Sequence, residues 1–304
     1  MVSTWMNFEI NNMKSKILDA IWRLLMHILP DKPYLKLRYF VIFKRRLDLR
    51  NPETLSEKIQ WLKLYGCRPE YTMMVDKVAV KDFVSETIGP QYVIPTLGVW
   101  DNPEDIDFDS LPERFVLKAN HNSNGIHICK DKASFDRAAA VADLKKQLSR
   151  DYFLEGRENS YRGMKKKVFA ETYMEDTAAG ELIDYKLFCY DGEVKFLFIA
   201  TGRQKYAEPY FDFFDADFNH LELKQGHPNA PVTPSKPVTF GLMKELASKL
   251  SEGIPFVRVD FYEVDGKVYF GEMTFYHFNG FMPFVPGSWD KTFGQWLVLP
   301  EKTV

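Results

Sequence analysis

The sequence lacks several features that would assign a protein class by themselves. Among its 304 residues there are only three cysteines, Cys67, Cys129 and Cys189, and no CxxC pair occurs. Their odd number and wide spacing argue against a disulfide framework and against a zinc knuckle. A reducing, cytoplasmic compartment is therefore the simplest one to expect.

Long apolar runs and an excess charge of one sign are also absent. No stretch reaches the roughly 18–20 apolar residues of a membrane span. The first apolar run begins after Lys16 and lacks a small-residue cleavage site, so we expect no signal peptide. Lys and Arg number 40 and Asp and Glu 42, for a formal net charge of -2. This balance gives no reason to expect nucleic acid as a partner.

The chain has enough apolar residues for one or two sizeable cores, with 45% hydrophobic and 15% aromatic residues. Charge is uneven, because residues 1–50 hold ten Lys and Arg against four Asp and Glu. Within them, residues 17–29 have apolar side chains at helical spacing. Such a helix either packs on the body of the protein or lies on an anionic membrane surface, at the inner face of the membrane.

Residues 51–110 are expected to be mainly helical. The stretch "NPETLSEKIQWLKLYG" (51–66) has Thr54 and Glu57 in capping-box spacing, which predicts a helix with a marked start. A second helix is predicted from Asp76 to Gly89, with the glycine as its C-cap. Residues 92–100 read as a short strand and loop.

From residue 114 the pattern changes to short strands with few helices. Strands are predicted at 115–119, 125–130, 168–174, 184–190, 193–200 and in the two arms of a hairpin at 256–275. Helices are predicted at 134–150 and 240–252, and residues 226–240, which contain four prolines, read as an irregular loop. This order favours an α+β protein of two lobes.

The hairpin "FVRVDFYEVDGKVYFGEMTF" contains charges within its apolar strands. Arg258 and Asp260 share one face of the first strand. A two-residue turn at 265–266 would put Asp260 and Glu272 on opposite faces of the hairpin. A three-residue loop at 264–266 would instead place Arg258 opposite Glu272, with Asp260 on the same face.

Two carboxylates that converge from neighbouring strands repel each other and are costly to bury. A divalent cation would resolve this, since Mg²⁺ prefers carboxylate oxygens completed by phosphates and water. The alternative is that Arg258 neutralises one carboxylate in a half-exposed sheet.

Lysines in two other segments fit phosphate binding. In "FVLKANHNSNGIHICKDK" (115–132), a strand delivers Lys118 and a polar loop with Gly125 follows, as expected for a loop folding over phosphates. A plain hairpin with a surface lysine is the alternative. Asp184 and Lys186 share one strand face, either at a solvated edge or in a site. Together, these lysines, the two acids and Arg258 are the parts of a phosphoryl-transfer site.

The order of these segments resembles the ATP-grasp fold. More specifically, "NPETLSEKIQWLKLY", "DKVAVKDFV", "IPTLGVWDNPEDIDFDSLPERFVLKANHNSNG" and "VRVDFYEVDGKVYFGEMTF" resemble the TupA-like ATP-grasp family, which is associated with teichuronopeptide and other bacterial surface-polysaccharide biosynthesis. The resemblance covers about residues 50–290. It implies a small lobe at 111–175 and a large lobe at 176–304 that holds the metal hairpin and the acceptor site.

The resemblance implies ATP and Mg²⁺ as cofactors and assigns residues to them. Lys118 would contact inner phosphates, and His121, Ser123, Asn124 and Gly125 would belong to the loop that covers ATP. Glu171, Tyr173 and Met174 would form the adenine hinge, Asp184 would lie near the ribose or phosphates, and Lys186 would contact the terminal phosphate. Asp260 and Glu272 would hold Mg²⁺, Arg258 would stabilise an oxyanion, and Thr274 stands where many relatives have an asparagine ligand.

Acceptor contacts are expected in two segments. Arg203 and Lys205 lie among aromatics in residues 200–220, where bases can bind a carboxylate and rings can stack on sugars, although a core-packed connection explains them equally. His277 and Asn279 lie in "FYHFNGF" (275–281), which replaces a segment richer in glycine and proline in the family. His277 is either an acceptor contact or a packed residue.

The expected function is an ATP-dependent carboxylate-amine ligase that joins an amino acid to a uronic-acid carboxylate of a surface polysaccharide, or of its precursor, through an acyl phosphate. A sugar or glycan kinase is the first alternative and would need no oxyanion arginine. A glycosyltransferase is the second, since "DAD" (215–217) has the form of a DxD metal motif. A non-catalytic scaffold is the third.

Overall fold

The computed structural model describes residues 21–122, 125–177, 180–202 and 208–302. A helical segment at 21–28 is followed by the helices α2 (Asp31–Phe43), α3 (Leu55–Tyr65), α4 (Glu70–Val75), α5 (Val80–Thr87), α6 (Arg137–Ser149), α7 (Tyr152–Gly156), α8 (Phe240–Ser251) and α9 (Ser288–Trp296). The strands are β1 (Thr96–Trp100), β2 (Phe115–Ala119), β3 (His127–Cys129), β4 (Val168–Thr172), β5 (Asp184–Tyr190), β6 (Glu193–Thr201), β7 (Tyr210–Asp215), β8 (Val257–Val264) and β9 (Lys267–Thr274). Short 3-10 helices are η1 (Pro90–Tyr92), η2 (Pro103–Asp105), η3 (Asn159–Tyr161) and η4 (His277–Gly280).

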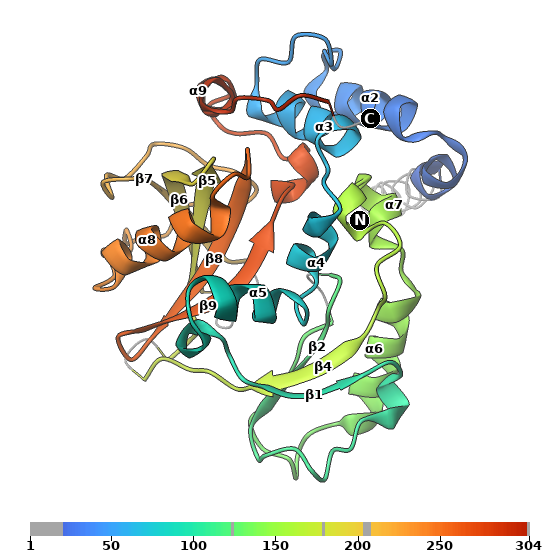
Figure 1. Cartoon of the computed structure of the whole chain (residues 1–304), viewed down its shortest axis with the longest axis vertical. Helices are drawn as coiled ribbons and strands as arrows, with labels where there is room; N and C mark the ends of the chain where they lie inside the picture. Colours follow the sequence, from blue (N-terminus) through green and yellow to red (C-terminus); the bar gives the residue numbers. More distant parts are fainter. Residues whose placement is uncertain (1–20, 123–124, 178–179, 203–207, 303–304) are drawn as a thin grey trace, which may run out of the picture.

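The strands form two antiparallel sheets, which confirms the α+β class. The small sheet has the order β1-β4-β2-β3 and the large sheet the order β7-β6-β5-β8-β9. Figure 1 shows α8 on the outer side of the large sheet, α6 beside the small sheet, and α4 and α5 between the two. β1 belongs to the small sheet, so this sheet begins before residue 110, where the helical region was expected to end. β7 was not predicted as a strand.

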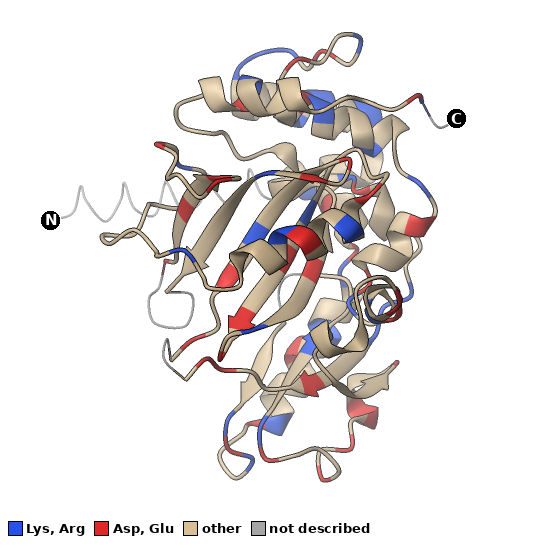
Figure 2. Cartoon of the chain, turned by 60° about the vertical axis from the view of Figure 1, so that its left-hand side comes forward, with Lys and Arg blue, Asp and Glu red and all other residues tan. Residues whose placement is uncertain are grey.

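Alternation along β8 sets the two faces of the large sheet. Val257, Val259 and Phe261 are fully buried on the side that α8 covers. Arg258 and Asp260 lie between them in sequence and therefore face the other side. Figure 2 shows charged segments within the central strands of this sheet as well as at its edges. The charged face is therefore a consequence of strand periodicity once the apolar face is packed.

The expected helix starts are partly confirmed. Thr54 and Glu57 form the predicted capping box at α3, with Thr54 N–H donating to Glu57 Oε2 at 3.1 Å. α5 begins at Val80, later than predicted, because the Asp76 carboxylate accepts N–H bonds from the next turn, at 2.9 Å from Val78. Gly89 follows the C-cap with φ of 117°, which suits a glycine.

Of the two turns that the sequence left open, the hairpin at β8 and β9 has the two-residue turn and not the three-residue loop. Val264 pairs with Lys267, and residues 265–266 both have positive φ, at 49° and 74°. The pairing then shifts by one residue at Gly271, which places Asp260 directly opposite Glu272. The prediction that a two-residue turn separates these carboxylates was wrong, because it assumed an unbroken ladder.

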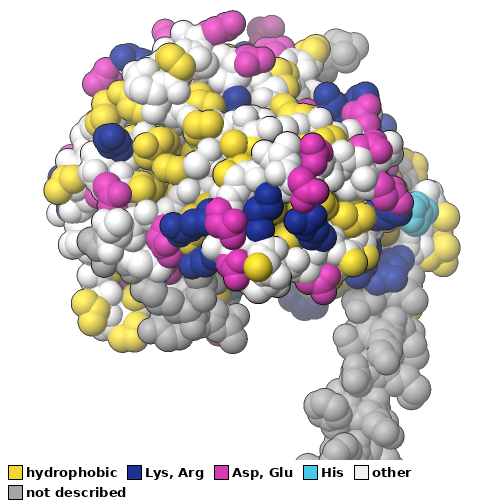
Figure 3. All heavy atoms as spheres, turned by 90° about the horizontal axis from the view of Figure 1, so that it is seen from below, with side chains coloured by type: hydrophobic (Ala, Val, Ile, Leu, Met, Phe, Trp, Pro, Cys, Tyr) yellow, Lys and Arg dark blue, Asp and Glu magenta, His cyan; other side chains and the backbone are white. Residues whose placement is uncertain are grey.

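The surface bears charges of both signs. On the face at the bottom of Figure 1, which Figure 3 views directly, Lys and Arg side chains are interspersed with Asp and Glu among the coloured residues. None of the described helices is long and apolar enough to cross a bilayer.

The bulge generates a prediction about stability. A Cβ at Gly271 would lie 3.2 Å from Asp260 O and 3.2 Å from a ring carbon of Tyr262. Gly271→Val is therefore expected to lower the free energy of unfolding by about 1–3 kcal/mol in urea denaturation. Gly241→Val is the control, since nothing lies within 4 Å of a Cβ there and valine suits a helix better than glycine. Equal stability of the two variants would contradict this account of the bulge.

Candidate active site

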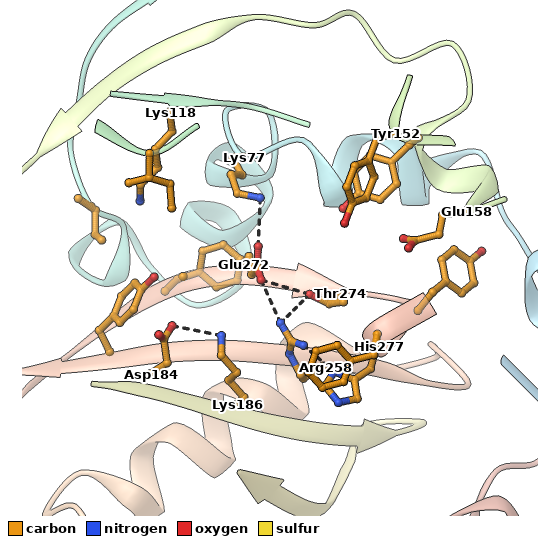
Figure 4. Close-up of a pocket in the computed structure, with 18 of the residues that line it drawn as sticks. Lys77, Lys118, Tyr152, Glu158, Asp184, Lys186, Arg258, Glu272, Thr274 and His277 are labelled. Atoms are coloured by element: carbon orange, nitrogen blue, oxygen red, sulfur yellow. Dashed lines mark hydrogen bonds and ion pairs between the residues drawn. The ribbon is translucent and has the colours of Figure 1, made fainter. Parts of the chain in front are cut away.

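A cavity of about 330 Å³ lies between the two sheets. Its walls come from both sheets, from the segment joining α4 to α5, from the region around α7 and η3, and from η4. Charged side chains line it: Lys77, Lys81, Lys118, Glu158, Glu171, Asp184, Lys186, Arg258 and Glu272. Figure 4 shows Lys118 and Asp184 toward one end, Tyr152 and Glu158 toward the other, and Glu272 and Arg258 between them. The structure thus brings together charges from segments far apart in sequence.

Arg258 is the centre of this cluster. Its Nε and one terminal nitrogen donate to the two carboxylate oxygens of Asp260 at 2.6 and 2.7 Å. The same terminal nitrogen lies 2.9 Å from Glu272 Oε1 and 3.0 Å from Thr274 Oγ1. Such a planar fork fixes the guanidinium more firmly than a lysine could be held.

His277 contacts the terminal nitrogen of Arg258 that does not bind the carboxylates. This nitrogen donates to His277 Nδ1 at 2.8 Å. Nε2 therefore carries the proton and donates to Gln225 Oε1 at 2.9 Å. Burial, with Arg258 and Lys186 nearby, lowers the pKa of His277 well below its usual value, so the ring is neutral. Both ring nitrogens of His277 are engaged by protein side chains, so the structure does not show one directed at an acceptor. The expected acceptor contact of His277 stays a prediction.

Lysines complete the charge balance. Lys186 contacts Asp184 at 3.1 Å and also pairs with Asp260, and Lys77 lies 3.0 Å from Glu272 Oε2. Burial raises the pKa of Glu272, but Lys77, Lys186 and Arg258 outweigh it and hold that pKa well below the ordinary value. Three carboxylates thus face three basic side chains. Repulsion between carboxylates does not by itself require a metal ion.

The expected magnesium ligands differ in accessibility. Glu272 and Thr274 line the cavity, and the Glu272 side chain is 26% exposed. Asp260 is 1% exposed, and both its oxygens are held by Arg258 and Lys186. No group of three or more His, Cys, Asp or Glu suited to a metal occurs in the part of the chain that the structure describes. A site with one accessible carboxylate still suits Mg²⁺ that is also held by phosphates and water.

A second group of charges lies at the small sheet. Lys118 on β2 pairs with Glu171 on β4, and Lys81 contacts the other oxygen of Glu171 at 3.1 Å. Burial raises the pKa of Glu171, but the two lysines hold it below its usual value. Two ammonium groups therefore share one buried carboxylate at this wall, and both line the cavity.

Other predicted residues lie away from the cavity or outside the described residues. His121 is buried, its Nε2 lies 3.2 Å from Gln147 O, and it does not line the cavity. Gly125 packs against Gln147 with φ of 70°. Tyr173 and Met174 follow β4 without lining the cavity, and their role as a hinge stays a prediction. Ser123, Asn124, Arg203 and Lys205 lie outside the described residues.

Sequence reasoning missed several cavity residues. Lys77 and Lys81 are four residues apart in "DKVAVK", and this spacing was a usable signal for two cations on one side of a helical turn. Tyr152 and Glu158 carry no such signal. The "DAD" motif is a turn: Asp215 Oδ1 accepts the N–H of Asp217 at 2.9 Å, and neither aspartate lines the cavity.

The Glu171 pair predicts an effect of acid. Because the folded pKa is lowered, the stability from this pair is fully present above the unfolded pKa of about 4.3 and is lost as pH falls through the lower, folded pKa. Glu171→Gln should lose less unfolding free energy between about pH 5 and pH 3 than wild type, by on the order of 1 kcal/mol. Urea unfolding across this range measures it, with Glu86→Gln, at an exposed position of α5, as control. An acid-induced loss as large as that of wild type would refute the pairing.

Known proteins similar to this chain occur among solved structures and family models. Among solved structures, the chain is similar to an L-amino acid ligase from Bacillus licheniformis (14% identity, 80% of this chain and 55% of that chain, TM-score 0.43) and to D-alanine–D-alanine ligase from Bacillus anthracis with ATP (16%, 66% and 55%, TM-score 0.39). It spans just over half the length of those chains. No curated protein gave a significant match. A family model described as TupA-like ATPgrasp matches residues 57–298. The chain therefore belongs to the TupA-like ATP-grasp family and has the ATP-grasp fold.

Proposed function

We propose that the protein is an ATP-dependent carboxylate-amine ligase that works through an acyl phosphate. The observation that carries this proposal is one cavity that Lys118 lines from the small sheet and that Lys186 and Arg258 line from the large sheet. Lysines suit phosphate oxygens, and a fixed arginine suits an oxyanion. Family membership supports ATP as the nucleotide.

Two steps follow from these residues. A substrate carboxylate oxygen bonds to the terminal phosphorus of ATP while the bond to the ADP oxygen breaks, and Lys118 and Lys186 offset the negative charge. When bound, Mg²⁺ supplies further neutralisation of the phosphates, and Glu272 with Thr274 would hold it. The nitrogen of the substrate, as a neutral amine, then bonds to the acyl carbon, and Arg258 stabilises the resulting oxyanion. The bond from that carbon to the phosphate oxygen breaks, and inorganic phosphate leaves with the proton that the nitrogen loses.

The substrates are proposed from the family. We infer a uronic acid of a bacterial surface polysaccharide or its precursor as the carboxylate, and an amino acid as the amine. The partly exposed ring of Tyr262 in the cavity wall supports a ring-shaped acceptor, because aromatic faces stack on sugars.

The alternatives are less well supported. A kinase would transfer phosphate to a hydroxyl and would have no use for the bidentate Arg258 held by His277. A glycosyltransferase would need the 215–217 motif as a metal site, but Asp215 caps a turn there. A scaffold would not need the accessible charges of the cavity.

Nucleotide turnover tests the proposal. Wild-type protein with Mg-ATP, a panel of amino acids and a uronic-acid acceptor should release ADP only when both acceptors and Mg²⁺ are present. Glu272→Gln should lower that rate by about 100-fold or more, because it removes the accessible carboxylate between Lys77 and Arg258. Glu86→Gln, remote from the cavity, should turn over as wild type.

Two outcomes would contradict the ligase. ADP formed with sugar alone, with the phosphate retained on the sugar, establishes the kinase. Absence of ATP binding leaves Arg258, Asp260 and Glu272 as a structural ion cluster.

The described part of residues 1–50 supports a peripheral membrane contact. Leu24, Ile28 and Phe40 are 60%, 61% and 52% exposed, and the same segment also exposes Ile21, Leu37 and Val41. Several exposed apolar side chains in one segment are expected where it contacts another surface. Exposed bases accompany them: Arg23, Lys32, Lys36, Lys44, Arg45, Arg46 and Arg50. We propose that this segment rests on the anionic surface at the inner face of the membrane.

Vesicle binding tests this contact. The double variant Leu24→Ser with Phe40→Ser should bind vesicles of phosphatidylglycerol and phosphatidylcholine at least about tenfold more weakly than wild type. Val232→Ser is the control, because Val232 is 82% exposed in a distant loop. Sedimentation with vesicles measures both, and equal binding of wild type and the double variant would remove the proposal.

A further inference from the structure

Glu158 is a buried carboxylate that the two proposed steps do not use. It is 4% exposed, lies between α7 and η3, and lines the cavity at the end away from Lys118. Within the residues that the structure describes, its carboxylate forms neither a hydrogen bond nor an ion pair. An uncompensated carboxylate is expensive to bury, so a cationic partner is expected.

Lys63, the basic side chain that acts most strongly on Glu158, is engaged elsewhere. Lys63 uses its three N–H groups on Gln60 Oε1 at 3.1 Å, Gly156 O at 2.7 Å and Asn279 O at 2.7 Å. Burial raises the pKa of Glu158 to about 7, with Lys63 opposing part of that rise. Lys63 thus acts on the carboxylate through space and leaves its oxygens open to a ligand.

A second acceptor without a partner lies beside Glu158. Asn279 Oδ1 is buried and forms no hydrogen bond among the described residues. A Cβ placed on Gly156 would lie 1.4 Å from this atom and 3.2 Å from Glu158 Oε1. The two oxygens therefore converge at a glycine, where no side chain separates them.

Tyrosine rings complete this end of the cavity. Tyr152 and Tyr161 meet edge to face with ring centroids 4.9 Å apart, and Tyr276 lines the same cavity. Ring faces attract ammonium groups, most strongly where water is excluded. A carboxylate, an amide oxygen and aromatic rings together match a cation with several N–H donors.

We propose that Glu158, Asn279 and the tyrosines Tyr152 and Tyr161 form the binding site for the ammonium group of the amine substrate. This inference rests on the proposed ligase function and names the place where its amino acid enters. Arg258 lies between this site and Lys118, so the amine would approach Arg258 from the side opposite Lys118. Glu158 thus positions the amine substrate and does not contact the phosphates.

Calorimetric titration tests the site with free amino acids and their N-acetyl derivatives, which keep the side chain but lose the cation. At least one free amino acid should bind wild type in the presence of a non-hydrolysable ATP analogue, and its N-acetyl form should not. Glu158→Gln should weaken that binding by about tenfold or more, with ATP-analogue affinity unchanged within about twofold. Glu155→Gln is the matched control, since that carboxylate pairs with Arg150.

Two further readouts separate the site from a structural role. Glu158→Asp should restore part of the affinity, and Tyr152→Leu should weaken amine binding alone if Glu158→Gln fails to fold. In turnover assays of Glu158→Gln, KM for the amino acid should rise while KM for ATP stays constant.

Amino-acid binding that depends on Glu158, without ADP release, would refute the ligase but keep the site. ADP release with unchanged amino-acid affinity in Glu158→Gln, or no binding of any free amino acid, would overturn the site.

Discussion

The bidentate pair of Arg258 with Asp260 is the interaction on which the candidate site depends. It lies on the cavity-facing side of β8, and its geometry is set by Glu272 from β9 and by neutral His277 from η4. Removing one partner would leave a buried charge with only part of its compensation, Lys186 for Asp260 or Glu272 for Arg258, and a buried charge that loses a partner is strongly destabilising. The hairpin bulge, which places Glu272 opposite Asp260, and the neutral histidine therefore both fix the position of the Arg258 guanidinium.

The cavity separates its charges by position. Lysines that share Glu171 occupy the wall of the small sheet, and the Arg258 cluster occupies the large sheet. Each carboxylate of that cluster has a basic neighbour, so the arrangement is balanced before a nucleotide binds. Negative phosphates would then compete with Glu171 and Glu272 for the lysines, which allows binding to redistribute ion pairs without moving a sheet.

The sequence predicted the strands other than β7, the capped helix and most charged residues of the cavity, because these follow from periodicity and from a family pattern spread along the chain. It did not predict the bulge at Gly271, since a register shift depends on how a whole ladder packs. Lys77 was missed although its spacing from Lys81 was visible. Glu158 could not have been found, because only tertiary packing makes a polar loop residue a buried one.

Isotope transfer tests the central claim most directly. If a carboxylate attacks the terminal phosphorus, a substrate with oxygen-18 in both carboxylate oxygens must deliver one of these labels to the inorganic phosphate released in the second step. Mass spectrometry of the phosphate should find one labelled oxygen for each amide formed. Unlabelled phosphate, or label that stays entirely in the sugar product, would contradict the acyl phosphate and with it the role given to Arg258.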